Sequence, residues 1–305
     1  FMEYGLNMKG FIKKITPNII HLIYRYYYHH KRIPNLLRPK LFNEKVALRM
    51  LKPKKIYSVM ADKIAVREYV KERIGEKYLI PMLWTSENLT RVDWDSLPNS
   101  FVLKANHASG TNLIVHSKNT HNFDSVQQLT NSWLSTDFSK INFEKHYKHI
   151  KPMLLAEQLL KSEDGRIPFD YKVHCFNSVN DTKFFIQVDY DRFESEGTAH
   201  SRDFFDQEWN FVPFTLDYKN STCPASRPNN LDKLLSLSKK LSEGLAYARI
   251  DWYIINDEPL FGEITLTHGC AGEKFTPEKY NKMWGELWDD IYEKHHSKKL
   301  HSKKG

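Results

Sequence analysis

The clearest hydrophobic pattern of the chain is a strict alternation near its C-terminus. Over residues 248–255 apolar side chains alternate with Arg249, Asp251 and Tyr253. Side chains on a β-strand point alternately to its two faces, so this pattern predicts a strand with one polar face. A second stretch of strand-forming residues, 259–265, follows after a short polar segment. The two stretches together predict a β-hairpin.

The length of the hairpin loop decides which side chains face each other. With residues 256–258 as the loop, Asp251 lies opposite Glu263, and Arg249 lies opposite Thr265. A loop that is one residue shorter or longer would put Asp251 and Glu263 on opposite faces. We expect the three-residue loop.

Elsewhere, apolar residues at spacings of three and four predict helices. The predicted helices cover residues 9–32, 42–51, 61–74, 123–147, 231–245 and 277–293. The first is basic and amphipathic, and it fits either an anionic membrane surface or the core of the protein itself. Short β-rich segments predict further strands at 100–105, 112–116, 153–160, 170–176 and 183–190. Residues 191–210 read as a mobile polar connection of the kind that often covers a site.

Composition narrows the class of protein. The 305 residues are 41% hydrophobic, which is enough for a large core. Cys175, Cys223 and Cys270 lie far apart and lack metal-site spacing, so a reducing compartment is indicated. We find no signal peptide and no apolar run of about 18 residues. A cytoplasmic protein is expected.

The charge indicates an anionic partner. The net charge is +8, and basic residues are concentrated at the two ends of the chain. A nucleotide, an acidic polysaccharide or an anionic membrane fits this charge. Nucleic acid is disfavoured, because aromatic residues are not interleaved with a basic groove pattern.

Three stretches carry candidate chemistry. Asp251 and Glu263 facing each other repel unless a cation lies between them, which suggests Mg²⁺ with Arg249 on a phosphoryl oxygen; the alternative is a solvated acidic face. The loop 106–112, after Lys104, has the glycine and hydroxyl residues that let backbone N–H groups surround phosphate, although an ordinary turn explains it too. Glu157 on an apolar strand suggests an adenine edge or, alternatively, a solvent-facing edge position.

The order of these motifs resembles the TupA-like ATP-grasp family, which is associated with teichuronopeptide and capsular polysaccharide synthesis. The resemblance covers roughly residues 42–288 and rests on the motifs Asp62-Lys63, Phe101 to Lys104, Glu157-Gln158, Asp170 to Lys172, Arg249 to Asp251 and Phe261 to Thr265. It implies an α+β fold in which two lobes clamp ATP. We predict a basic helical extension at 1–41, a helical subdomain at 42–98, a small lobe at 99–160, a large lobe at 161–293 and a basic tail at 294–305.

The resemblance also implies residue roles. Lys63, Lys104 and the loop residues Asn106, Ser109, Gly110 and Thr111 would contact phosphates. Glu157, Gln158 and Leu160 would meet adenine, Asp170 the ribose, and Lys172 the nucleotide. Asp251 and Glu263 would bind Mg²⁺, Arg249 the reacting phosphoryl group, and His107 or His268 would act as a base. Thr265 departs from the expected asparagine, which leaves a third magnesium ligand open.

The implied reaction forms an amide. ATP phosphorylates a carboxylate, and an amine attacks the resulting acylphosphate. The family association suggests a uronic acid of a bacterial surface polysaccharide, or its precursor, as the carboxylate and an amino acid as the amine, with peripheral contact at the inner membrane. The alternatives are an ATP-dependent sugar kinase and a non-catalytic basic glycan-binding protein.

Overall fold

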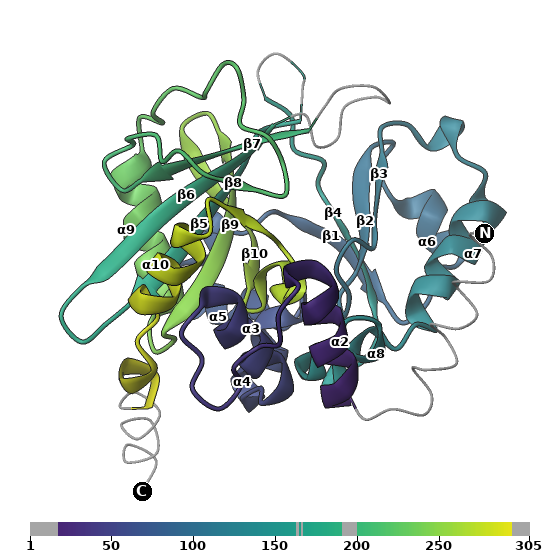
Figure 1. Ribbon diagram of the computed structural model, residues 1–305. Helices are drawn as coiled ribbons and strands as arrows, with labels where there is room; N and C mark the ends of the chain where they lie inside the picture. Colours follow the sequence, from purple (N-terminus) through teal and green to yellow (C-terminus); the bar gives the residue numbers. More distant parts are fainter. Residues whose placement is uncertain (1–17, 163–164, 166, 191–199, 295–305) are drawn as a thin grey trace, which may run out of the picture.

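The computed structural model describes residues 18–162, 165, 167–190 and 200–294, which form two lobes (Figure 1). Predictions for residues 9–17, for 191–199 and for the tail after residue 294 lie outside the described residues. The mixed architecture confirms the predicted α+β fold class. In the described part of the chain, no helix combines the length and apolarity needed to cross a membrane.

The larger lobe is built on a five-stranded antiparallel sheet with the order β10-β9-β5-β6-β7. Its strands are β5 (Asp170–Asn177), β6 (Thr182–Tyr190), β7 (Ser201–Asp206), β9 (Tyr247–Ile255) and β10 (Glu258–Thr265). Strand β7 lies where we predicted a mobile connection, so that prediction is wrong for residues 201–206. Arg202 and Asp203 of this strand are both buried although they are charged, so the sequence lacks the alternation of apolar and polar residues that predicts a strand.

The two faces of this sheet have different surroundings. On one face, Ile250 and Trp252 pack in a core with α5 (Val66–Ile74) and α9 (Leu231–Ser242). On the other face, Tyr247 packs in an aromatic core with α3 (Phe42–Leu51) and α10 (Lys279–Leu287). Further along β9, Arg249 and Asp251 occupy the face that Tyr247 begins. The predicted alternation therefore sets the polar residues of the site beside an aromatic core.

The hairpin β9–β10 has a shorter loop than predicted. Ile255 pairs with Glu258, so the loop contains only Asn256 and Asp257. Both have positive φ, 49° and 60°, which these two residue types tolerate in tight hairpin turns.

A β-bulge compensates for the missing loop residue. The register shifts between Phe261 and Glu263, and beyond this shift Glu263 pairs with Asp251 and Thr265 with Arg249. The predicted pairing is confirmed, although the predicted loop is wrong. Gly262 lies at the bulge, where an added Cβ would come within 3.1 Å of the Asp251 carbonyl oxygen.

The smaller lobe is a four-stranded sheet with the order β1-β4-β2-β3 (Figure 1). Its strands are β1 (Met82–Ser86), β2 (Phe101–Ala105), β3 (Asn112–Val115) and β4 (Leu154–Glu157). Residues of α6 (Arg91–Ser96) and α7 (Phe123–Leu134) pack in one core with the sheet. Since β1 pairs with β4, the sheet includes residues before the predicted lobe boundary at 99.

Two predicted helices differ from the observed ones. The helix predicted at 61–74 begins only at Val66, as α5, because the Asp62 carboxylate accepts the N–H groups of Ile64 and Ala65 in the turn before it. The preceding α4 (Lys55–Ala61) is a separate helix that was not predicted. The helix predicted at 123–147 ends at Leu134 and gives way to α8 (Phe138–Ile141) and η3 (Lys145–His149). Phe143, with φ of 62°, cannot continue a helix.

The remaining elements complete the described chain. Helix α2 (Asn18–His30) precedes α3, and α10 is shorter than the helix predicted at 277–293, with residues 290–294 forming a separate helical segment. The short elements are η1 (Glu76–Tyr78), η2 (Lys118–Thr120), β8 (Thr215–Leu216), η4 (His268–Ala271) and β11 (Phe275–Thr276).

Candidate nucleotide and metal site

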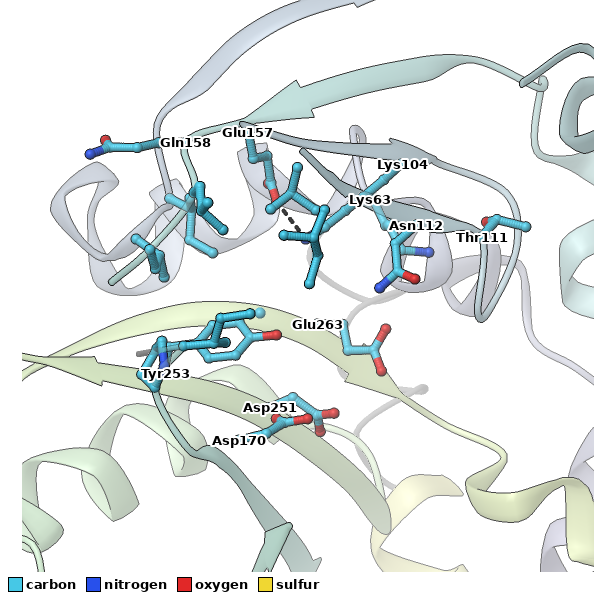
Figure 2. Close-up of a pocket in the computed structure, with 18 of the residues that line it drawn as sticks. Lys63, Lys104, Thr111, Asn112, Glu157, Gln158, Asp170, Asp251, Tyr253 and Glu263 are labelled. Carbon is cyan, nitrogen blue, oxygen red and sulfur yellow. Dashed lines mark hydrogen bonds and ion pairs between the residues drawn. The ribbon is translucent and has the colours of Figure 1, made fainter. Parts of the chain in front are cut away.

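A cavity of about 160 Å³ lies between the lobes (Figure 2). Most of the residues that the sequence assigned to ATP line it. They are Lys63, Lys104, Ser109, Gly110, Thr111, Glu157, Gln158, Leu160, Asp170, Asp251 and Glu263. Residues separated by up to two hundred positions in the chain thus surround one space.

Part of the cavity wall is apolar. Its apolar side chains include Ile80, Val102, Ile114, Leu159 and Tyr253. Such a wall suits a flat heterocycle, whose faces bind apolar surface while its edges meet backbone groups. Sequence reasoning placed Tyr253 on the polar face of β9 but assigned none of these residues to the site.

On the small-lobe side of the cavity, one carboxylate forms ion pairs with two cations. Lys104 Nζ lies 2.6 Å from Glu157 Oε2, and Arg67 lies 3.1 Å from Glu157 Oε1. Glu157 is buried, so its carboxylate is held by two cations at the cavity wall. Arg67, on α5, was missed because no local motif distinguishes it from other helix residues.

On the large-lobe side, Arg249 and Lys172 offset the charge of the carboxylates. Arg249 donates to both oxygens of Asp251 at 2.7 Å, and Lys172 donates to Asp251 at 2.9 Å. Burial opposes ionisation of Asp251, but Arg249 and Lys172 outweigh it and hold its pKa below the ordinary value. Arg249 also reaches Glu263 at 3.3 Å. Cations of the chain itself therefore relieve the repulsion expected between Asp251 and Glu263.

The donor chemistry of this side fits magnesium. Asp251 and Glu263 offer hard carboxylate oxygens to the cavity, and Mg²⁺ typically takes one or two carboxylates together with substrate phosphates. Among the residues that the structure describes, no three His, Cys, Asp or Glu side chains form a complete metal site. These carboxylates would accordingly hold Mg²⁺ only with oxygens from a bound phosphate.

Three more of the assigned residues lie close to Asp251 and Glu263. Thr265 accepts from Arg249 at 2.9 Å and donates to Glu263 at 3.3 Å, so its hydroxyl positions these groups. Asp170, assigned to the ribose, lies beside Asp251 (Figure 2). Lys172, assigned to the nucleotide, is buried between Asp170 and Asp251 and does not line the cavity.

The loop after β2 divides into an exposed tip and a buried base. Ser109, Gly110 and Thr111 line the cavity. Asn106 is buried below them, where its side chain bonds to Asp62, Lys151 and Met153. His107 is also buried, contacts Asn106 at 3.3 Å and does not line the cavity. Asn106 and His107 therefore brace the loop, and their position does not support contact with phosphate or action as a base.

His268 is placed to orient Arg249. Its Nδ1 accepts from Arg249 at 2.7 Å, and its Nε2 faces Glu273 at 2.5 Å. Burial lowers the pKa of His268, Glu273 opposes this, and Arg249 adds to the lowering. A neutral ring with its proton on Nε2 can accept from Arg249 at Nδ1 while its Nε2 lies against the Glu273 carboxylate. Because Arg249 occupies Nδ1 and Glu273 lies against Nε2, this geometry favours a positioning role over the predicted role as a base.

A family model agrees with this geometry. The model of the TupA-like ATP-grasp family matches residues 44–289, which is most of the chain. The chain belongs to the TupA-like ATP-grasp family. The predicted resemblance is confirmed.

Other comparisons place this ATP-grasp chain among distant structures. A search of the curated proteins finds no match. The D-alanine–D-alanine ligase of Helicobacter pylori is 15% identical with a TM-score of 0.41, and the match covers 75% of this chain and 63% of that one. The RiPP-associated ATP-grasp ligase of Chryseobacterium gregarium, solved with ADP and a leader and core peptide, is 13% identical with a TM-score of 0.38, covering 77% and 61%.

Proposed function

We propose that this ATP-grasp enzyme uses ATP to join a carboxylate to an amine through an acylphosphate. The supporting observation is that Asp251 and Glu263, both bonded to Arg249, lie on one wall of a cavity whose opposite wall carries Lys63 and Lys104. Cations on both sides of a polyphosphate offset the charge that develops during phosphoryl transfer.

The nucleotide would lie along the cavity. Its base would occupy the apolar wall near Tyr253, and its phosphates would lie between Lys104 and the loop tip at Ser109 to Thr111. Asp251 and Glu263 would hold Mg²⁺, whose contribution is to offset phosphate charge. Arg249, oriented by His268, would hold an oxygen of the transferring phosphoryl group.

We further propose that the carboxylate belongs to a uronic acid of a bacterial surface polysaccharide or its precursor, and that the amine is an amino acid. The net charge of +8 and the resemblance to a polysaccharide-associated family support an acidic glycan.

One experiment tests the reaction. The protein is incubated with Mg-ATP, oligoglucuronate and a mixture of the twenty protein amino acids, and ADP release and product mass are measured. We expect ADP release that requires both the glycan and the amino acids, with a mass gain of one amino acid minus water. ADP release with a phosphorylated glycan and no need for amine would instead establish a sugar kinase.

The outer face of α2 is proposed to contact an anionic membrane. Residues 18–41 contain five Lys or Arg residues and no acid. Tyr24, Tyr27 and Tyr28 are each more than half exposed on α2. Aromatic side chains combined with basic residues favour the interface of an anionic bilayer. Such contact would bring a membrane-borne glycan precursor to the enzyme.

A further inference from the structure

A second, larger chamber adjoins the nucleotide cavity. Its volume is about 510 Å³, and Lys63, Ser109, Gly262 and Glu263 line both spaces. The two spaces therefore share a wall. The volume lies in the range of small-molecule sites.

Several charged side chains of this chamber already have an ion-pair partner, either in the chamber or in Asp251 of the nucleotide cavity. Arg202 contacts Asp189 at 2.6 Å and Glu273 at 3.0 Å, while Arg249 and Lys172 hold Asp251. Burial opposes ionisation of Glu273, but His268 and Arg202 lower its pKa to about 2. A carboxylate held this firmly in its ionised form is a weak base, so these acids are poor proton acceptors.

Glu144 is in a different environment. Its side chain lines the same chamber, is 4% exposed and accepts a hydrogen bond from the hydroxyl of Thr267. Burial raises its pKa, and nearby donors only partly oppose this. The groups that face it are Thr267 and Cys270 of the η4 region, Asn142 and Tyr147 of its own segment, and Arg25 of α2.

His146, two residues further on, also lines the chamber. It is 2% exposed, and within the described chain its Nδ1 has no hydrogen-bond partner. Burial and Arg49 lower its pKa to about 4, so the ring is neutral near pH 7. A buried polar atom without a partner costs stability unless a ligand or water completes it. His200 Nε2 also lacks a hydrogen bond within the described chain, but it lies 3.4 Å from the Asp189 carboxylate, whereas His146 has no ion-pair partner there.

We propose that Glu144 receives the ammonium group of the amine substrate in this chamber and takes its proton, with His146 as a second polar contact. This inference rests on the proposed amide-forming function and assigns the amine side of that reaction. The interruption of the helix predicted at 123–147 makes this arrangement possible. On a continuous helix, Glu144 and His146 would point to opposite sides and could not both line one chamber.

The reaction balances as follows. The ammonium group gives one proton to the Glu144 carboxylate and becomes a neutral amine. The nitrogen lone pair forms the C–N bond at the acylphosphate carbon, and the C–O bond to phosphate breaks with its electron pair leaving on phosphate. The second nitrogen proton leaves with the phosphate. Glu144 returns its proton to solvent between turnovers.

The test compares two nucleophiles in the Glu144→Gln variant. Hydroxylamine is largely neutral near pH 7 and traps an acylphosphate as a hydroxamate, so it does not need a proton acceptor. ADP release and product are measured with Mg-ATP and oligoglucuronate, once with hydroxylamine and once with the twenty amino acids. The matched control is Glu44→Gln, a buried glutamate that caps α3 and lines neither cavity.

Loss of a general base typically reduces turnover about 100-fold or more. We therefore expect Glu144→Gln to lose amide formation by about 100-fold while it keeps hydroxamate formation within about threefold, and Glu44→Gln to keep both. The rise of kcat/KM with pH on the acid side should also disappear in the variant.

The outcomes separate the two proposals. Equal loss of both reactions in folded Glu144→Gln, or full retention of amide formation, overturns the role of Glu144. If the wild-type enzyme forms neither hydroxamate nor amide, the proposed function itself is wrong. Melting curves of each variant, with and without Mg-ATP, distinguish a chemical defect from unfolding.

Discussion

The two adjoining cavities differ in how their walls are built. The nucleotide cavity combines an apolar wall with short motifs, such as Ser109 to Thr111 and the alternating Asp251 and Tyr253 of β9. The second chamber is lined by buried side chains from distant elements, including Glu144, His146 and Arg202. The nucleotide site can therefore be predicted from short sequence motifs, whereas the second chamber can be identified only from the tertiary structure.

The shared wall residues show how the cavities are coupled. Glu263 and Gly262 line both spaces and lie at the bulge of β10. Arg249 lines only the second chamber, yet it holds Asp251, which lines only the first. Changes at this hairpin should consequently affect both cavities, and changes elsewhere should separate them.

The largest effect is expected at Glu263. Its side chain is 40% exposed, so Glu263→Gln should leave the fold intact while it removes a carboxylate from the proposed magnesium position. Loss of a charge-stabilising group at a phosphoryl-transfer site typically lowers kcat by about 100- to 1000-fold. ADP release measures the effect, and an unchanged melting temperature of the variant confirms folding.

Asp251→Asn makes a useful contrast. Asp251 is buried with Arg249 and Lys172, so its removal leaves two cations without their partner and is expected to cost about 3–5 kcal/mol of stability. Near-normal turnover in Glu263→Gln would contradict the metal assignment. Loss of turnover in Asp251→Asn alone would not establish it, because unfolding explains that result.

A charge pair outside both cavities provides the next test. Glu293 is buried with Arg49 at 3.0 Å. Burial opposes its ionisation, but Arg49, Lys54 and Tyr57 lower its pKa to about 2. Because the folded pKa lies below the ordinary value, the pair stabilises the protein above about pH 4.5, and this contribution, about 3 kcal/mol, is lost as pH falls toward 2.

Glu293→Gln should therefore lower the unfolding free energy near neutral pH by about 3–5 kcal/mol and flatten its decrease in acid. Urea unfolding at several pH values measures both effects. An acid dependence as steep as that of the wild type would show that other carboxylates dominate acid unfolding. Activity at low temperature should remain, since Glu293 lines neither cavity.

The hairpin shows how far sequence could go. Alternation of Arg249, Asp251 and Tyr253 was enough to predict the polar face, because a strand admits only two faces. The two-residue loop and its compensating bulge were not predictable. Either feature alone would put Asp251 and Glu263 on opposite faces of the hairpin, and only the two together keep them opposite each other. The correct pairing was thus reached from a wrong loop length.

Other parts of the site needed the fold. Strand β7 was missed because Arg202 and Asp203 are buried polar residues, and their partners Asp189 and Glu273 lie far away in sequence. The roles predicted for His107 and His268 rested on residue type, while hydrogen bonding decides what each ring can do. Charged residues that pair between distant elements produce no periodic pattern in the sequence, so they cannot be predicted from it.

Gly262→Ala tests the coupling of the two cavities. A Cβ at this position would come within 3.1 Å of the Asp251 carbonyl oxygen, so the bulge must shift by a few tenths of an ångström. We expect a stability loss of about 1–2 kcal/mol and a roughly tenfold decrease in kcat, with hydroxylamine and amino acids affected equally. A selective loss of amide formation would place the defect in the second chamber alone.

Helix α2 links the proposed membrane contact to the second chamber, and changes there are expected to affect binding and not turnover. Its inner face holds the chamber wall, since Arg25 donates to Asn142 at 3.1 Å and His30 contacts the Ala271 carbonyl at 2.8 Å. Its outer face carries Tyr24 and Tyr28. A bilayer bound there would lie behind the chamber that is proposed to receive the amine.

Vesicle sedimentation at low salt measures this contact. Each basic residue near an anionic surface contributes about 1 kcal/mol, so the Arg38→Ala and Lys40→Ala pair should weaken binding to phosphatidylglycerol vesicles by roughly 30-fold, and Tyr24→Ser with Tyr28→Ser should weaken it further. The control, Lys140→Ala with Lys282→Ala, removes equal charge from exposed positions on α8 and α10. Equal weakening by both pairs would mean that net charge alone attracts the protein, and the basic stretch 18–41 would then have no special part in membrane contact.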